Sequence, residues 1–242
     1  MTYIDGFVIA VPTARKEEFV RHANSCDAVF KEQGATRIVE AWGDDVPRGK
    51  VTDFHGAVRA TDDETVAFSW IEWPDKATRD AAMARMDDLM KSDDRLSPEN
   101  NPMPFDGKRM IYGGFAPILD ERAEGMSGYT DGYVLPVHPD KQDAYRAVAA
   151  KAAPLFREHG ATRVVEAWGD DVPDGKVTDF RRAVKAADGE NVVFSFVEWP
   201  DKATRDRGWE KLMADERMKP DGDMPFDGKR MFWGGFRPVV EL

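Results

Sequence analysis

The sequence predicts an α+β fold: two ferredoxin-like βαββαβ modules in tandem, pairing their sheets into one α/β barrel. Three observations support this prediction. Long sequence blocks recur once along the chain in the same order. The apolar pattern of each copy alternates between strand and helix in the order β-α-β-β-α-β. The first strand is apolar on both faces, which is typical of a sheet covered on both sides.

The recurring blocks set the module boundaries. They are VEAWGDDVP (39–47 and 165–173), GKVTDF (49–54 and 175–180), EWPDKATRD (72–80 and 198–206) and MPFDGKRM (103–110 and 224–231). The offset is 126 residues (165 − 39) for the early blocks and 121 (224 − 103) for the last one. The second copy is therefore five residues shorter, and the loss precedes MPFDG. We expect a first module over 1–118, a polar linker over 119–128 and a second module over 129–242.

Each element of the first module has its own signal. Residues 3–11 alternate as a strand with Phe7, Ile9 and Val11 on one face, and an amphipathic helix follows that ends at Gly34. Residues 36–42 predict a second strand, GDDVP a turn, and residues 65–73 a third strand. Asp75 is placed to cap a helix that runs to about residue 91, and residues 109–115 form the last strand.

The helices of such a module cover only one face of its sheet. The sheet of the sister copy is the obvious cover for the other face, which would make a barrel of the kind that two separate chains form as a dimer. The sequence leaves open whether the copies pair within one chain, as a pseudo-dimer and a monomer, or between two chains in a homodimer.

The composition limits the classes of partner. The 242 residues carry 34 Lys and Arg against 45 Asp and Glu, a net charge of −11 that disfavours nucleic acid. No apolar run is long enough to span a membrane, and the N-terminus does not read as a signal peptide. Cys26 is the only cysteine, which excludes an internal disulfide. These features favour a cytoplasmic protein.

The blocks YIDGFV, EAWGDDVP, GKVTDF, FSW and MPFDGKRMIYGGF resemble the YbaA-like family of small bacterial proteins of unknown function, within the dimeric α/β-barrel superfamily. The resemblance covers both halves of the chain. It implies the barrel and a pairing of modules, and it carries over no catalytic residue. The superfamily includes cofactor-free oxygenases, haem-handling proteins, isomerases and ligand-binding modules, so the fold alone does not fix an activity.

Polar residues inside apolar strands are the candidate catalytic groups. Asp5, Asp131, Glu40 and Glu166 are carboxylates of this kind, with Ser69 and Ser195 nearby in the pattern. A carboxylate among apolar neighbours must be paired, hydrogen-bonded or shifted in pKa, and one that faced the barrel interior would be a candidate general acid or base. If only one half kept a site, His55 is the most plausible base.

A second group of residues is expected to bind a ligand. Aromatic residues suit a flat, partly apolar molecule in a cavity between the sheets, and Arg side chains suit a carboxylate or phosphate. The candidates are Trp42, Trp168, Asp53, Asp179, Arg109 and Arg230. Ion pairs between these arginines and acidic turns are the alternative.

Two motifs are interpreted as structural. The pairs Asp44-Asp45 and Asp170-Asp171 are expected to cap backbone N–H groups in turns, rather than to bind a cation. Arg79 is expected to pair with Asp75 one helical turn earlier.

The sequence implies no metal and no cofactor. None of the four histidines recurs in the other copy, and no two have the spacing of metal ligands. Three functions remain open: a small-molecule-binding barrel, a cofactor-independent oxygenase or isomerase that uses a carboxylate or His55, and a structural or interaction module with a filled barrel.

Overall fold

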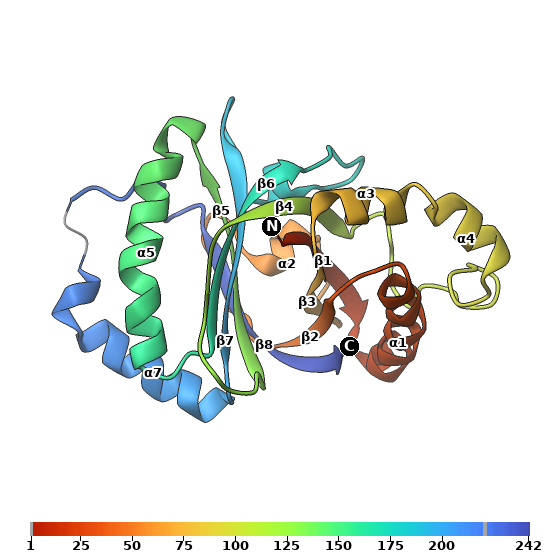
Figure 1. Ribbon diagram of the computed structural model, residues 1–242, viewed down its shortest axis with the longest axis horizontal. Helices are drawn as coiled ribbons and strands as arrows, with labels where there is room; N and C mark the ends of the chain where they lie inside the picture. Colours follow the sequence, from red (N-terminus) through yellow and green to blue (C-terminus); the bar gives the residue numbers. More distant parts are fainter. Residues whose placement is uncertain (1, 220–221) are drawn as a thin grey trace.

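Eight strands close into one barrel in the computed structural model, which describes residues 2–219 and 222–242 (Figure 1). The strand order around the barrel is β1-β3-β2-β8-β5-β7-β6-β4, and β4 pairs with β1 to complete it. The elements of the first half are β1 Tyr3–Pro12, α1 Lys16–Glu32, β2 Arg37–Asp45, α2 Phe54–Ala57, β3 Glu64–Trp73, α3 Lys76–Met83, α4 Met86–Ser92 and β4 Ile111–Arg122. Those of the second half are β5 Tyr129–Val137, α5 Gln142–Glu158, β6 Arg163–Asp171, α6 Phe180–Ala183, β7 Asn191–Trp199, α7 Lys202–Ala214 and β8 Phe232–Glu241.

Two antiparallel seams join the halves. Strand β2 pairs with β8, and β4 pairs with β6. The predicted pairing of two ferredoxin-like modules is confirmed, and it takes place within one chain. The seam also corrects the expected linker, because residues 119–122 belong to β4 and pair with β6.

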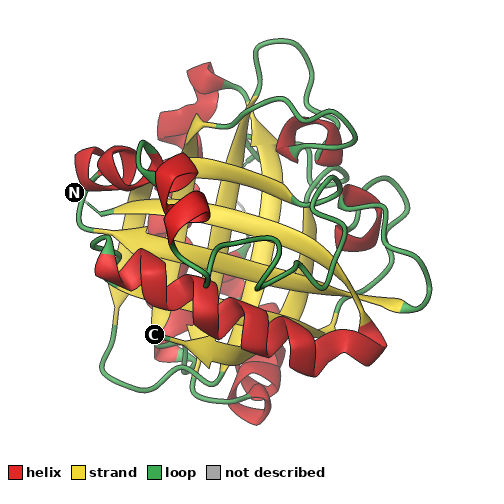
Figure 2. Cartoon of the chain, turned by 90° about the vertical axis from the view of Figure 1, so that its right-hand side faces the viewer, coloured by secondary structure: helices red, strands yellow, loops and turns green. Residues whose placement is uncertain are grey.

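Each strand has one face toward the barrel interior and one toward the helices. Along β1, Ile4 and Val8 join the interior cluster, whereas Ile9 and Val11 pack beneath the helix layer, as the alternation predicts. Helices α1 and α3 cover the first half, with α4 projecting beyond them, and α5 and α7 cover the second (Figures 1 and 2). Within the described residues, no helix is both long enough and apolar enough to cross a membrane.

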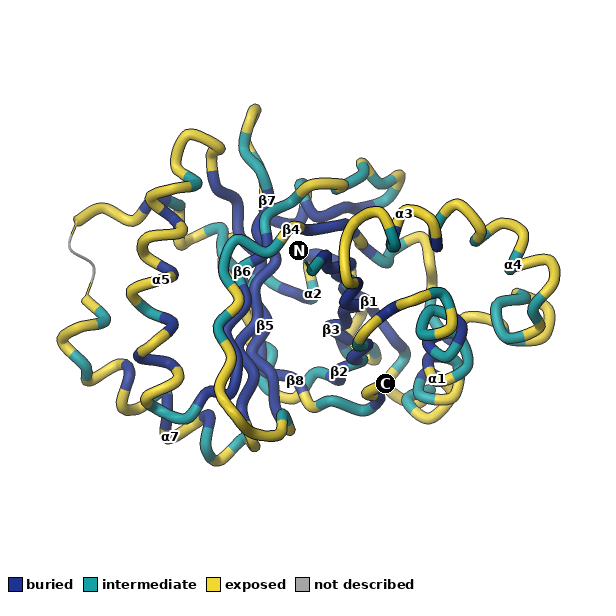
Figure 3. Tube along the Cα trace, viewed as in Figure 1, coloured by how far each residue is buried: buried dark blue, intermediate teal, exposed yellow. Residues whose placement is uncertain are grey.

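Aromatic side chains fill the barrel interior. Phe68 of one sheet stacks on Phe194 of the other at 4.6 Å between ring centroids, and Trp70 stacks on Phe196 at 4.3 Å. A Cβ at Gly6 would lie 2.7 Å from the ring of Phe194, so this ring occupies the space that Gly6 leaves by having no side chain. The cavity expected between the two sheets is therefore absent from the described structure. Figure 3 shows that the buried residues concentrate in the strands, above all in β1, β3, β5 and β7.

The short helices α2 and α6 add to this interior. The ring of Phe54 in α2 lies 4.8 Å from that of Phe232, and the ring of Phe180 in α6 lies 5.4 Å from that of Phe115. Asp53 begins α2 by accepting the N–H of Gly56. The GKVTDF block thus positions a phenylalanine in the barrel core of each half.

Two predicted elements differ from those observed. Residues Gly43 to Asp45 are part of β2 rather than a turn, because their strand continues beside β8. The helix that Asp75 caps ends at Met83, and a separate helix, α4, covers 86–92.

Candidate functional site

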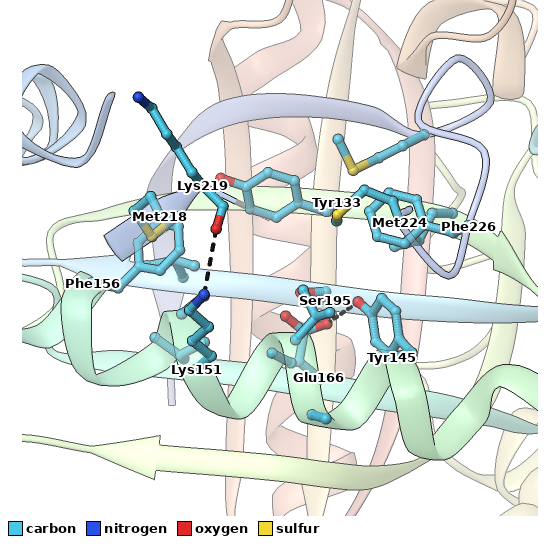
Figure 4. Close-up of a pocket in the computed structure, with 18 of the residues that line it drawn as sticks. Tyr133, Tyr145, Lys151, Phe156, Glu166, Ser195, Met218, Lys219, Met224 and Phe226 are labelled. Atoms are coloured by element: carbon cyan, nitrogen blue, oxygen red, sulfur yellow. Dashed lines mark hydrogen bonds between the residues drawn. The ribbon is translucent and has the colours of Figure 1, made fainter. Parts of the chain in front are cut away.

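The clearest cavity lies on the helix side of the second module, between α5 and the outer face of β5, β6 and β7 (Figure 4). Its volume is about 450 Å³, within the range of small-molecule sites. Its lining is mainly apolar and includes Leu135, Ala149, Ala152, Phe156, Val164, Val197, Trp209, Met218, Met224, Phe226 and Met231.

Three polar residues form a row on the strands beneath the cavity. Tyr133 of β5 is paired with Ser195 of β7, which is paired in turn with Glu166 of β6. Directly opposed residues point to the same face of a sheet, so all three side chains face α5. The strand pairing therefore places a polar row in an apolar site.

Glu166 is the ionisable group within this row. Its Oε2 accepts the hydroxyl of Tyr145, a residue of α5, at 2.5 Å. Burial raises the pKa of Glu166 to about 7, although hydrogen bonds from Tyr145 and Ser195 act in the opposite direction. No salt bridge among the described residues reaches this carboxyl. Near neutral pH it is thus present in both protonation states and can exchange a proton.

Tyr133 contributes a second polar group to the lining. Its hydroxyl is buried and has no hydrogen-bond partner among the described residues. In Figure 4 this hydroxyl points toward the side of the cavity where Lys219 lies, away from Glu166. Because a buried hydroxyl is costly without a partner, this one is suited to a ligand.

The first module repeats the carboxyl and the serine but not the tyrosines. Ser69 donates a short hydrogen bond to Glu40, and Phe7 and Phe19 stand where the second module has Tyr133 and Tyr145. Asp27 of α1 lies near Glu40 as an additional buried carboxyl. Burial and the charge of Glu40 raise the pKa of Asp27, whose Oδ2 has no partner in the described structure. The two modules thus share a framework and differ in chemistry.

Family models and relatives agree with this two-module architecture. The model described as "Protein of unknown function (DUF1428)" matches residues 2–107 and again 128–228. The chain belongs to the DUF1428 family. The uncharacterized protein YbaA of Escherichia coli K12 is 60% identical over 114 residues, which are 97% of that protein and 47% of this chain. A protein of Shigella flexneri with the same description matches equally well.

Solved structures support the fold of this DUF1428 protein. A protein of Lactobacillus acidophilus NCFM named "putative monooxygenase" matches at a TM-score of 0.58 with 10% identity, over 99% of this chain and 95% of that one. An anthrone oxidase-like protein matches at 0.53 with 13% identity, over 100% and 92%. At such low identity these likenesses show the fold alone.

In this DUF1428 chain the strand carboxylates face the helices, so none of them meets the condition of facing the barrel interior. Glu40 and Glu166 lie beneath α1 and α5. Asp5 accepts hydrogen bonds from Nε1 of Trp73 and Nε of Arg79, both at 2.9 Å. Burial raises the pKa of Asp5, while Arg79 lowers it.

Asp131 repeats this arrangement in the second half. It accepts hydrogen bonds from Nε of Arg205 at 2.8 Å and from Nε1 of Trp199 at 3.0 Å, and Trp209 is a third donor. Asp5 and Asp131 are therefore satisfied by protein groups, and neither lines the cavity.

The Asp-Asp pairs receive side chains from the opposite half instead of capping turns. Asp44 accepts the hydroxyl of Tyr129 at 3.0 Å, and Asp45 accepts Nη1 of Arg205 at 3.0 Å. Asp171 likewise accepts Nη1 of Arg79 at 2.8 Å. The expected pair between Arg79 and Asp75 is wrong, because Arg79 bridges Asp5 and the other half.

The six residues expected to bind a ligand lie outside the cavity lining. Asp179 begins α6 as Asp53 begins α2. Trp42 packs under α1, and Trp168 packs beside Leu135. Arg109 forms two hydrogen bonds to Glu64, at 2.6 and 2.7 Å, and Arg230 pairs in the same way with Glu190. Whether these residues bind a ligand stays a prediction.

His55 also lies apart from the cavity, on α2. Its Nδ1 is buried without a partner in the described residues, and burial lowers the pKa of its ring.

Glu166 is among the candidate residues that the sequence predicts, whereas Tyr133 and Tyr145 are not. Two signals were available. Both tyrosines replace a phenylalanine of the first copy, Tyr133 on the face of β5 toward α5 and Tyr145 on the face of α5 toward the sheet. The missing five residues lie next to MPFDG, whose second copy supplies Met224 and Phe226 to the lining.

Proposed function

We propose that the second module binds a small, largely apolar molecule in the cavity beneath α5, with Glu166 hydrogen-bonding its polar group. The observation that carries this proposal is an apolar cavity of about 450 Å³ around a carboxyl that no described cation neutralises. A ligand that fills such a space gains from burying apolar surface, and the few polar groups orient it. The proposal includes the cytoplasmic location that the sequence predicts.

The test is a titration with the neutral fluorescent dye N-phenyl-1-naphthylamine. We expect enhanced fluorescence with one site per chain. Val148 lines the cavity and is 37% exposed, so Val148→Trp should weaken binding at least tenfold by filling the entrance. Ala150→Trp, on an exposed position of the same helix outside the lining, is the matched control and should bind normally. Equal dye binding by both variants would place the dye elsewhere and defeat the proposal.

A cofactor-independent enzyme is the second candidate. It is favoured by the pKa of about 7 for Glu166, because a general acid or base works best near the operating pH. The discriminating variant is Glu166→Gln. An enzyme would keep its affinity for a ligand retained from the cell and lose its conversion, whereas a binding protein would leave that ligand chemically unchanged in both forms.

A further inference from the structure

The first module places its own side chains where the second has its cavity. Four positions that line the cavity have counterparts in the first copy by the offsets of 126 and 121 residues. The pairs are Val148 with His22, Ala152 with Cys26, Gly222 with Asn101 and Phe226 with Phe105. In the first module, side chains of the chain itself therefore occupy the space that corresponds to the cavity.

The side chains that occupy this space are the flat imidazole ring of His22 and the flat amide of Asn101. Nδ1 of His22 lies 3.0 Å from Oδ1 of Asn101, and the imidazole packs edge-on against Phe105 at 5.9 Å between centroids. Nδ2 of Asn101 donates to the carbonyl of Arg95 at 2.6 Å and lies 3.4 Å from Sγ of Cys26. Ring and amide are thus hydrogen-bonded to each other and held between α1 and residues 95–105.

The second module lacks both groups and keeps the phenylalanine beside them. Val148 and Ala152 are smaller than their counterparts, and Gly222 has no side chain. Among the described residues other than its chain neighbours, a Cβ built on Gly222 would meet no atom within 4 Å. Phe226 remains in place, with its ring 5.8 Å from that of Tyr145. The space that a ring and an amide occupy in the first module is therefore part of the cavity in the second.

We infer that the cavity binds a flat, neutral ring that carries an amide-type group, the combination that His22 and Asn101 supply in the first module. This inference rests on the proposed function and specifies its ligand class. The ring would pack against Phe226. The hydroxyl of Tyr133 lies buried in the cavity wall without a described partner, and a small shift of its ring would let it hydrogen-bond the amide. Glu166 disfavours an anionic group beside it, although Lys151, Arg217 and Lys219 also line the cavity.

The test compares three probes of similar size by calorimetry at pH 7: benzamide, toluene and benzoate. We expect benzamide to bind at least tenfold more tightly than either of the others. If the dye binds but benzamide is no better than toluene or benzoate, the inference fails and the proposed function stands. If neither the dye nor any of these probes binds, the proposed function fails with it.

Two variants locate the benzamide site. Tyr133→Phe, which copies Phe7 of the first module, should weaken benzamide about fivefold or more and leave toluene unchanged. Val148→His combined with Gly222→Asn copies the filling of the first module and should abolish benzamide binding, while Val148→Leu should retain it. Unchanged benzamide affinity in both the Tyr133→Phe protein and the double variant would overturn the inference.

Discussion

At the scale of single residues, the two modules differ most in how they treat a buried carboxyl. Glu166 has hydrogen bonds from Tyr145 and Ser195, whereas Glu40 has only Ser69 in the described structure and lies near Asp27. A group whose pKa differs between the folded and unfolded states makes stability depend on pH. Both carboxyls should therefore make the stability of the protein depend on pH, even without a ligand.

The pH dependence of stability tests the environment of Glu166. The folded pKa is about 7, against 4.5 for the free side chain. Below pH 4.5 both states hold the proton, and from there to pH 7 only the unfolded state releases it, so stability falls over this range and is constant above it. Relative to Glu166→Gln, the wild type should lose up to about 3 kcal/mol between pH 4.5 and 7. Urea unfolding measures this difference, and parallel curves would contradict the assigned environment.

Replacing Asp27 by alanine should stabilise the protein at neutral pH. Its Oδ2 is buried without a described partner, and the second module has Ala153 at this position, fully buried. Removing an unsatisfied buried polar group is worth about 1–3 kcal/mol. The gain appears as a higher urea midpoint. Ala153→Asp is the matched control and should destabilise; a loss of stability in Asp27→Ala would mean that Asp27 has a partner.

At the scale of elements, the helix that follows each third strand also ties the two halves together. Arg205 of α7 links buried Asp131 of β5 to Asp45 at the end of β2. Arg79 of α3 does the same for Asp5 and Asp171. These contacts give a physical role to the blocks EWPDKATRD and GDDVP, which the copies share unchanged.

Arg205→Met should destabilise the protein by about 3–5 kcal/mol, because it leaves Asp131 buried without its cation. Lys202→Met is the control on the same helix. Lys202 pairs with Asp44 at 3.4 Å while 33% exposed, and its loss should cost less than about 1 kcal/mol. Chemical denaturation measures both variants. Similar losses would show that the buried arginine has no special role.

Local pattern predicts the elements well and the long-range contacts poorly. The alternation along β1 and the cap at Asp75 are properties of neighbouring residues, and both are found as expected. The Gly/Pro pattern around Asp44 and Asp45 predicts a turn, whereas both residues continue β2 and bind side chains of the other half, among them Tyr129 and Arg205. The cavity depends on how residues beyond α7 pack over α5, which no local pattern encodes.

At the scale of the whole molecule, the two halves share one core. The interior cluster contains residues from both sheets, and Phe68 stacks directly on Phe194. Neither half can bury its inner face alone. We therefore expect one cooperative thermal transition, with equal calorimetric and van't Hoff enthalpies. Two resolved transitions by differential scanning calorimetry would mean that the halves fold independently.

The central claim is that the space beneath the long helix is a cavity in the second module and is filled by side chains in the first. A crystal structure under xenon pressure tests it most directly, because xenon enters empty apolar space. We expect xenon beneath α5, between Ala152 and Phe226, and none beside Cys26 or among the rings of the barrel interior. Xenon in the barrel interior or under α1, with none beneath α5, would contradict it.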